Sequence, residues 1–87
     1  MEKIILLPKA FSELRYWAEA DKDILVKIFE LIKDIQRELF SGIGKPEPLK
    51  HKLKGLWSRR ITKEHRLIYR VGNEEIVIVS CRFHYEK

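Results

Sequence analysis

Cysteine is nearly absent from the 87-residue sequence, and so are long apolar runs. The single cysteine, Cys81, excludes an internal disulfide and a cluster of thiolate metal ligands. No apolar stretch approaches the ~20 residues that a helix needs to span a bilayer. The apolar stretch at residues 4–8 is also too short for a secretory signal. We therefore expect a cytoplasmic protein with no membrane partner.

What the sequence does contain is a balanced composition with one basic segment. Its 45% hydrophobic and 36% charged residues fit one folded domain spanning residues 1–87. Residues 45–70 hold nine Lys or Arg and two acids, a net charge of +7, whereas the other 61 residues sum to −2. This asymmetry favours an anionic partner bound at one face. A solvated, lysine-rich surface has the same composition, so charge alone leaves both interpretations open.

Hydrophobic periodicity predicts two helices in the first half of the chain. After a short strand at residues 3–7, Pro8 suits the first turn of a helix that runs to about residue 20. Its apolar stripe is Phe11, Leu14 and Trp17. Asp21 is the expected N-cap of a second, longer helix. The apolar positions of that helix keep a helical period and face the core or a partner: Ile24, Ile28, Leu31, Ile35 and Leu39.

The second half of the chain predicts a loop followed by strands. Residues 41–48 are rich in glycine and proline and lack the glycine spacing and Lys-Ser/Thr ending of a P-loop. Strands are expected near residues 49–53, 56–62, 65–71 and 75–83, with turns at residues 63–64 and 72–73. The predicted fold class is α+β, with two N-terminal helices packed on one antiparallel sheet.

Alternation along the last two strands predicts which side chains face the helices. The uniformly apolar sets are Leu67, Tyr69 and Val71 on one strand and Val77, Val79, Cys81 and Phe83 on the other. A two-residue loop at residues 72–73 would place these sets on opposite faces, so we expect a loop of three residues or another odd length. The opposite face is then expected to be basic and to carry Arg66, Ile68, Arg70, Ser80, Arg82 and His84.

Two more side chains are placed by the same reasoning. A tight turn at residues 63–64 pairs Arg60 with Leu67, which puts Arg60 on the apolar side. Strict alternation puts Tyr85 on the side of Phe83, away from His84. Both residues would then face away from the basic side of the sheet.

The basic face contains side chains suited to RNA cleavage by internal attack. This reaction needs a base for the ribose 2′-hydroxyl, an acid for the leaving 5′-oxygen and cations around the phosphate. Glu47, in a proline-flanked loop, is the candidate base, Arg66 can fork onto phosphate oxygens, and His84 can transfer a proton near neutral pH. Each also has a plainer interpretation: a salt-bridge partner for Glu47, an exposed strand residue for Arg66 and a tail residue for His84.

Metal chemistry is not expected from the histidines. His51, His65 and His84 are far apart in the sequence and lack the spacing of metal ligands. Cys81 is expected in the core rather than as a nucleophile. We therefore predict no metal and no cofactor.

Three runs resemble the signature of the YoeB/Txe toxins, which belong to the RelE superfamily of bacterial toxin–antitoxin systems. They are residues 42–51 (GIGKPEPLKH), 55–69 (GLWSRRITKEHRLIY) and 81–85 (CRFHY). The pairs Tyr16-Trp17 and Asp21-Lys22 also resemble that family. Two differences are that Glu86 and Lys87 follow the His-Tyr pair, where the family usually stops, and that the first eleven residues match weakly.

This resemblance implies a RelE-like microbial RNase fold and an mRNA interferase. Such an enzyme is a metal-independent endoribonuclease that cleaves mRNA in the A site of the ribosome and inhibits translation. The expected products are a 2′,3′-cyclic phosphate and a 5′-hydroxyl. The implied partners are a YefM-like antitoxin, the ribosome and mRNA, with a toxin homodimer as a further possible assembly.

The resemblance also implies a role for each site residue. Glu47 would be the general base, His84 the general acid, Arg66 the group that stabilises the pentavalent phosphate, and Tyr85 a residue that orients the substrate or stacks on it. The remaining expected contacts to RNA phosphates are basic: Lys50, Arg60, Lys52 and Lys54.

Two other functions remain open at this point. A non-catalytic basic module that binds RNA or the ribosome would need the basic face but neither Glu47 nor His84. A catalytically inactive member of the family would serve only as a partner for an antitoxin.

Overall fold

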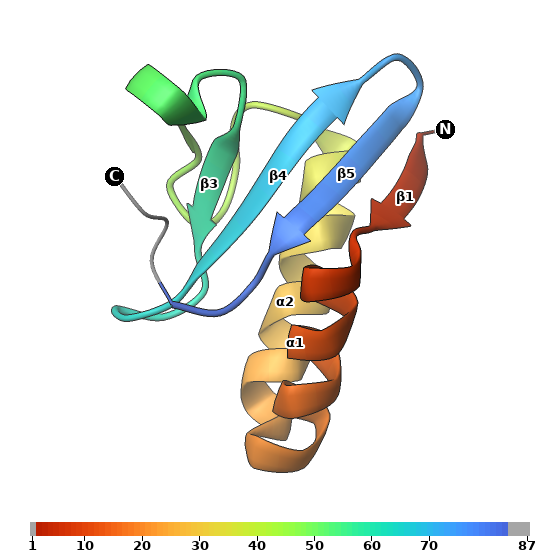
Figure 1. Ribbon diagram of the computed structural model, residues 1–87, viewed down its shortest axis with the longest axis vertical. Coiled ribbons are helices and arrows are strands. Elements are labelled where there is room, and N and C mark those ends of the chain that lie inside the picture. The colour runs from red at the N-terminus through yellow and green to blue at the C-terminus, as the bar shows by residue number, and fades with distance from the viewer. Residues whose placement is uncertain (1, 84–87) are drawn as a thin grey trace.

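A computed structural model describes residues 2–83 and shows an α+β architecture, as predicted. Both helices lie on one face of a five-stranded sheet whose strand order is β1-β5-β4-β3-β2 (Figure 1). No helix within residues 2–83 has the length and apolar character needed to cross a membrane. The elements in chain order are β1 (Lys3–Leu6), α1 (Pro8–Ala20), α2 (Lys22–Arg37), β2 (Glu47–Pro48), the short 3-10 helix η1 (His51–Leu53), β3 (Trp57–Arg60), β4 (Arg66–Gly72) and β5 (Glu75–Ser80).

The helices begin where the sequence predicts. Pro8 occupies the first turn of α1, where its missing N–H costs nothing. The Asp21 carboxylate caps α2 by accepting hydrogen bonds from two backbone amides of its first turn. The buried stripe of α1 differs from the prediction, because Ala10 joins Leu14 and Trp17 in the core, whereas Phe11 is 55% exposed.

The first strand corrects the expectation of a purely antiparallel sheet. β1 pairs with β5 in parallel, from Lys3 opposite Glu75 to Leu6 opposite Ile78. A parallel pair needs a long crossover between its strands, and here both helices and three other strands lie between β1 and β5. The sheet is therefore mixed.

The β4–β5 hairpin corrects the predicted register. Its loop has two residues, Asn73 and Glu74, because Gly72 pairs with Glu75. The strand therefore turns Ile76 and Ile78 toward the helices instead of Val77 and Val79. A bulge then shifts the pairing, so that Ile68 faces Ser80 while its neighbour Tyr69 faces Ile78. The extra residue reverses the alternation, which returns Cys81 to the helix-side core as predicted.

The connection between β3 and β4 corrects the predicted position of two arginines. Arg60 pairs with Arg66 and Arg59 pairs with Leu67, because residues 61–65 all belong to the connection. The expected tight turn at residues 63–64 is therefore wrong. Arg59 rather than Arg60 points to the helix side, where it is fully buried.

The sheet face away from the helices, here called the outer face, differs in part from the predicted basic face. Ile68 and Val77 are only 3% and 2% exposed, and Ser80 is buried as well. Arg82 does not belong to this face, because its guanidinium stacks on Tyr16 of α1. Two arginines of this face, Arg60 and Arg66, lie where β3 ends and β4 begins, a place here called the basic rim.

Candidate functional site

Strand pairing brings Glu47 onto the same face of the sheet as two arginines. Residues directly opposite each other in paired strands point to the same face. One row across the outer face therefore consists of Glu47, Ser58, Ile68 and Ser80, and the next row contains Arg60 and Arg66. Glu47 and Arg66 lie two strands and two residues apart, so regular strand geometry separates their Cα atoms by about 12 Å. Their long side chains can reach one nucleotide from two sides.

Arg60 and Arg66 form a pair of like charges directly opposite each other. Such a pair is unfavourable unless an anion lies between the two side chains. Arg60 is exposed, which leaves its guanidinium accessible to a ligand. The Arg66 Nη1 atom donates to the backbone oxygens of Thr62, Lys63 and His65 at 2.8–3.1 Å, which orients its guanidinium. The arrangement suits a phosphate group.

The loop that precedes Glu47 is fixed to β3 at Gly44. The Gly44 carbonyl accepts a hydrogen bond from the Arg60 amide at 2.7 Å. Gly44 has a φ of +81°, and a Cβ there would meet Leu31 Cδ2 at 2.8 Å and the Arg60 carbonyl oxygen at 3.1 Å. Only glycine fits this conformation and this close approach. Glu47 lies three residues after Gly44 in the chain, so its position depends on the contact between Gly44 and β3.

Arg59 holds the same loop from within the core, a role that the sequence analysis missed. Its side chain is fully buried and pairs with the Asp34 carboxylate at 2.6 Å. The guanidinium also donates to the Tyr69 hydroxyl and to three loop carbonyls, those of Glu38, Ile43 and Ser41. A buried charge with this many partners is costly to disturb. Arg59 therefore belongs to the support of the site rather than to its RNA-facing surface.

Asp34 is the anionic centre of this network. The Ile43 amide donates to its carboxylate, and Arg37 and Arg59 lie on either side of it. These contacts lower the pKa of Asp34 from 3.8 to about 2, mainly through the Ile43 amide and less through the two arginines. Burial raises the pKa of the neighbouring Tyr69 hydroxyl. Asp34 is thus held as a carboxylate that ties the loop to α2.

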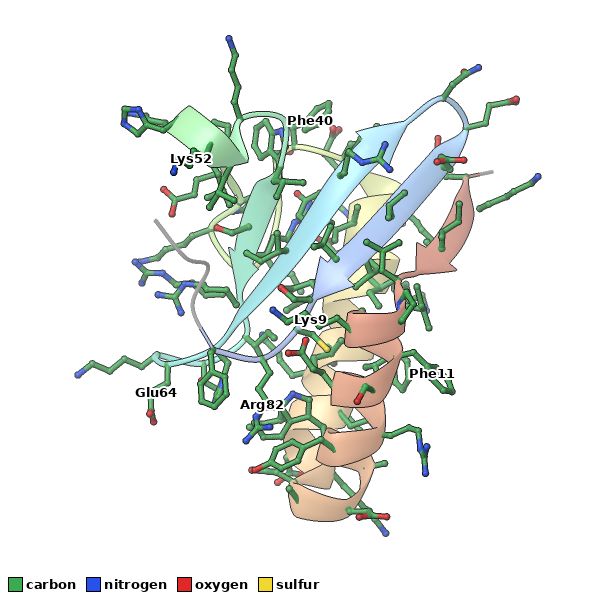
Figure 2. All side chains as sticks on the ribbon, in the orientation of Figure 1. Lys9, Phe11, Phe40, Lys52, Glu64 and Arg82 are labelled. Atoms are coloured by element: carbon green, nitrogen blue, oxygen red, sulfur yellow. The ribbon has the colours of Figure 1, made fainter. Side chains whose placement is uncertain are left out.

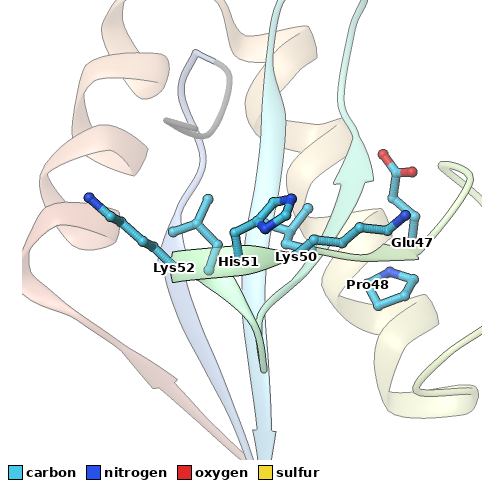
Figure 3. Close-up of a pocket in the computed structure, with 7 residues that line it drawn as sticks. Glu47, Pro48, Lys50, His51 and Lys52 are labelled. Atoms are coloured by element: carbon cyan, nitrogen blue, oxygen red, sulfur yellow. The ribbon is translucent and has the colours of Figure 1, made fainter.

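A groove of about 490 Å³ lies beside Glu47 and is lined by residues 47–53. Figure 3 shows Glu47 at one end and Lys52 at the other, with Lys50 and His51 between them. Lys50, His51, Lys52 and the nearby Lys54 are all exposed. The groove provides positive charge next to the one candidate base, which suits an RNA backbone.

Residues 81–83, here called the terminal segment, connect β5 to the predicted acid. Arg82 stacks on Tyr16, with the guanidinium carbon 3.6 Å from the ring centroid, and lies against α1 in Figure 2. The Phe83 carbonyl accepts a hydrogen bond from the Arg66 amide at 3.0 Å, so the described chain ends next to Arg66. His84 and Tyr85 lie outside the described residues, and their roles stay predictions.

Cys81 and the histidines bear on other kinds of chemistry. Burial raises the pKa of the Cys81 thiol to about 12, which leaves the thiol protonated and poorly nucleophilic near neutral pH. Within residues 2–83, no three side chains of His, Cys, Asp or Glu type are grouped as a metal site would require. The outer face instead carries the Glu47 carboxylate beside the cations Arg60 and Arg66.

Comparisons with known proteins agree with this fold. Residues 7–85 match the family described as the YoeB-like toxin of bacterial type II toxin-antitoxin systems. Toxin YoeB of Escherichia coli K12 is 54% identical over 83 residues, which cover 95% of this chain and 99% of that protein.

Solved structures give the same result. The YoeB/ParE toxin from Agrobacterium tumefaciens superposes with a TM-score of 0.93 at 40% identity, covering 95% of this chain and 99% of that chain. YoeB from Staphylococcus aureus has been solved as a dimer, with a TM-score of 0.90, 47% identity and coverage of 97% and 98%. It has also been solved in a heterotetrameric YoeB-YefM complex, with a TM-score of 0.88, 46% identity and coverage of 98% and 99%. The resemblance seen in the sequence is confirmed, and the chain belongs to the YoeB toxin family of bacterial type II toxin–antitoxin systems.

Proposed function

We propose that the protein is a metal-independent endoribonuclease that cleaves mRNA in the ribosomal A site and thereby inhibits translation. The observation that carries the proposal is the placement of Glu47 on the same face as the Arg60–Arg66 pair. A carboxylate on one side and two guanidiniums on the other supply the base and the cations that internal attack on a phosphodiester needs. The terminal segment reaches the same place, because the Phe83 carbonyl is bonded to the Arg66 amide.

In the proposed reaction, Glu47 removes the proton from a ribose 2′-hydroxyl, whose oxygen attacks the adjacent phosphorus. Arg66, with Arg60 beside it, stabilises the negative charge that develops on the phosphate oxygens. The P–O5′ bond breaks as His84 protonates the leaving oxygen, giving a 2′,3′-cyclic phosphate and a 5′-hydroxyl. Tyr85 orients or stacks on the substrate. The lysines beside Glu47 bind neighbouring phosphates: Lys50, Lys52 and Lys54.

The partners and location follow from this activity and from the family. A ribosome-dependent nuclease acts in the cytoplasm. A YefM-like antitoxin fits as the neutralising partner, since Staphylococcus aureus YoeB has been solved with YefM. An acidic antitoxin segment that folds over the basic rim would be steered by opposite charge. A homodimer of the toxin is a further assembly, as in the YoeB dimer from that organism.

The test is cleavage of mRNA on programmed ribosomes, with the natural substrate and with one carrying a 2′-deoxy nucleotide at the cut site. We expect Glu47→Gln to lower the single-turnover rate by at least ~10²-fold, and the deoxy substrate to resist cleavage. Because EDTA also disrupts ribosomes, the metal requirement is tested on a minimal RNA without ribosomes. EDTA should leave the cleavage rate of this RNA unchanged. Cleavage of the deoxy substrate would overturn the proposed mechanism.

The same assay separates catalysis from simple binding. Lys52→Ala and Lys54→Ala should weaken association and change its salt dependence, with little change in the rate at saturation. A wild-type protein that binds programmed ribosomes without cutting the mRNA would instead support the non-catalytic binding module.

A further inference from the structure

The terminal segment is held by a separate contact at each of its residues. The Cys81 amide donates to the Glu13 carboxylate at 2.8 Å, and the Cys81 carbonyl accepts from Trp17 Nε1 at 2.9 Å. Arg82 stacks between the rings of Tyr16 and Phe83. Three residues of α1 (Glu13, Tyr16 and Trp17) therefore fix the segment up to Arg82, but none of these contacts fixes the peptide of Phe83.

Phe83 itself is held by two adjacent residues, His65 just before β4 and Arg66 at its start. Its amide donates to Nδ1 of His65 at 2.8 Å, and its carbonyl accepts from the Arg66 amide at 3.0 Å. Phe83 also has a φ of +61°, in the left-handed region that side chains other than glycine rarely adopt. A conformation of this kind persists only where surrounding contacts enforce it.

The His65 ring accepts the hydrogen bond from the Phe83 amide at its Nδ1 atom. A backbone amide can only donate, so Nδ1 must carry a free lone pair, and in the neutral ring the proton then sits on Nε2. The ring is half-buried and packs edge-on against Trp17, with centroids 4.8 Å apart. Trp17 is 5% exposed and bonded to Cys81, so the ring that receives Phe83 is oriented by a residue that already holds the segment.

We infer that His65 is a positioning residue that directs the terminal segment into the site through the hydrogen bond from the Phe83 amide to its Nδ1. The inference rests on the proposed function, because Phe83 directly precedes the predicted acid, His84, in the sequence. His65 itself contacts no substrate in this role. Its contribution is to hold the peptide of Phe83 next to the Arg66 backbone.

Two variants separate the hydrogen bond from the packing of the ring. His65→Phe keeps an aromatic ring against Trp17 but has no acceptor for the Phe83 amide. His65→Asn loses the ring but places its amide oxygen close to the position of Nδ1. We expect His65→Phe to lower the saturated single-turnover rate at least ~10-fold with association nearly unchanged, since small misplacements of catalytic groups have large effects on rate. We expect His65→Asn to keep most of the rate.

Hydrogen exchange of the Phe83 amide, measured by NMR on the full chain, reports the bond without any activity assay. Protection of this amide should fall in His65→Phe and persist in His65→Asn. Thermal unfolding of both variants checks that each is folded at the assay temperature. If either variant is unfolded, hydrogen exchange in the wild-type protein still tests the inference. An unprotected Phe83 amide in the wild type would contradict its hydrogen bond to His65.

Three results would overturn the inference. They are an unchanged saturated rate in His65→Phe, an equal loss of rate in both variants, or a loss confined to association. If the wild-type protein cleaves no mRNA, the proposed function fails. The role of His65 in holding Phe83 is then tested only by comparing the hydrogen exchange of the Phe83 amide in the wild type and in His65→Phe. Equal Phe83 protection in His65→Phe and the wild type would then overturn that role too.

Discussion

The loop that leads to Glu47 is anchored by a network of buried charges, whereas the segment that leads to His84 is held by separate hydrogen bonds and one stacked arginine. Residues 38–44 surround the buried guanidinium of Arg59, and Gly44 packs against β3. The terminal segment is held by separate contacts, which are buried only at Cys81, where Trp17 donates to the carbonyl. Arg82 and Phe83 contact the exposed ring of Tyr16 and the half-buried His65. The same site is thus supported by a network of buried charges on one side and by separate contacts, mostly near the surface, on the other.

This difference separates two kinds of mutational effect. Removing one partner of a buried ion pair leaves the other charge uncompensated, which destabilises the whole fold. Removing a surface contact costs little stability, because water replaces the lost partner. We therefore expect substitutions on the Glu47 side to change mainly the free energy of unfolding. Substitutions on the terminal side should act mainly on the local order of residues 81–83.

Arg59→Leu should give the largest loss of stability. It leaves the Asp34 carboxylate without its buried partner and three loop carbonyls without a donor, and we expect a cost of about 3 kcal/mol or more. Equilibrium urea unfolding measures this cost. The matched control is Arg37→Ala, since Arg37 bonds to the same carboxylate but its side chain is 65% exposed. Its loss should be below about 1 kcal/mol, and equal losses would contradict the buried anchor.

Gly44→Ala should come next. The new Cβ would meet Leu31, Arg59 and the Arg60 carbonyl in a backbone conformation that alanine resists, so we expect a loss of about 2–4 kcal/mol. Gly55→Ala is the matched control. Gly55 also has a positive φ, of +99°, but a Cβ added there would have no neighbour within 4 Å. Urea unfolding should give a loss of about 1–2 kcal/mol there, and an equal or larger loss than for Gly44→Ala would refute the close approach.

Because Asp34 anchors the loop that leads to Glu47, the free energy of unfolding should depend on pH. Its pKa is about 2 in the folded protein and near 3.8 when unfolded, so the folded state binds the proton less readily. The resulting stability is fully present above about pH 5 and is lost as the pH falls through the folded pKa. Relative to Asp34→Asn, we expect the pH-dependent part of the wild-type advantage, on the order of 1–2 kcal/mol, to be present at pH 7 and to shrink between pH 4 and 2. Urea unfolding across this range tests it, and a constant difference would count against the shift.

Tyr16→Leu should have the smallest effect on global stability. It removes the ring under Arg82 at a site that is already 41% exposed, and a stacked pair of this kind contributes about 0.5–1 kcal/mol. Hydrogen exchange should show faster exchange at residues 81–83 and no change in the core of β4. Phe29→Leu, an exposed aromatic substitution on α2, is the control and should leave the terminal segment unchanged. Faster hydrogen exchange throughout the protein after Tyr16→Leu would show that the terminal segment and the loop that leads to Glu47 are not stabilised independently.

The parts of the fold predicted from sequence are those set by local chemistry. Asp21 caps α2 because its carboxylate reaches two free amides of the next turn, and Pro8 opens α1 for an equally local reason. The class of the fold follows from the two periodicities. The parallel pairing of β1 with β5 depends on residues far apart in the chain, so the local pattern did not reveal it.

The register of the strands was the main source of error, because a shift of one residue in the pairing moves every side chain of a strand to the opposite face of the sheet. The bulge in β5 lets Ile78 and Cys81 both face the helices although they are three residues apart. The longer β3–β4 connection exchanged the positions of Arg59 and Arg60. An arginine in the core gives no hydrophobic signal, so the only indication was that Arg59 shares its face with Trp57 and Leu67 once the pairing is known.

The residues of the candidate site were chosen from sequence motifs rather than from the register of the strands. The sequence motifs identified Glu47, Arg66 and Arg60, and the structure brings these three onto one face. Their supports were not predicted, because the anchors at Asp34, Arg59 and His65 act through contacts between distant segments. His84 and Tyr85 lie beyond the described residues and keep the status of predictions.

The most direct test of a jointly formed site is a double-mutant cycle on the single-turnover cleavage rate at saturating programmed ribosomes. If Glu47 and His84 act on the same phosphodiester, Glu47→Gln and His84→Ala should each lower the rate by at least ~10²-fold. The double variant should lose far less than the product of the two effects, since residues that act as a unit are not additive. A saturated rate that survives His84→Ala, or two effects that multiply in full, would contradict a site formed jointly by the anchored loop and the terminal segment.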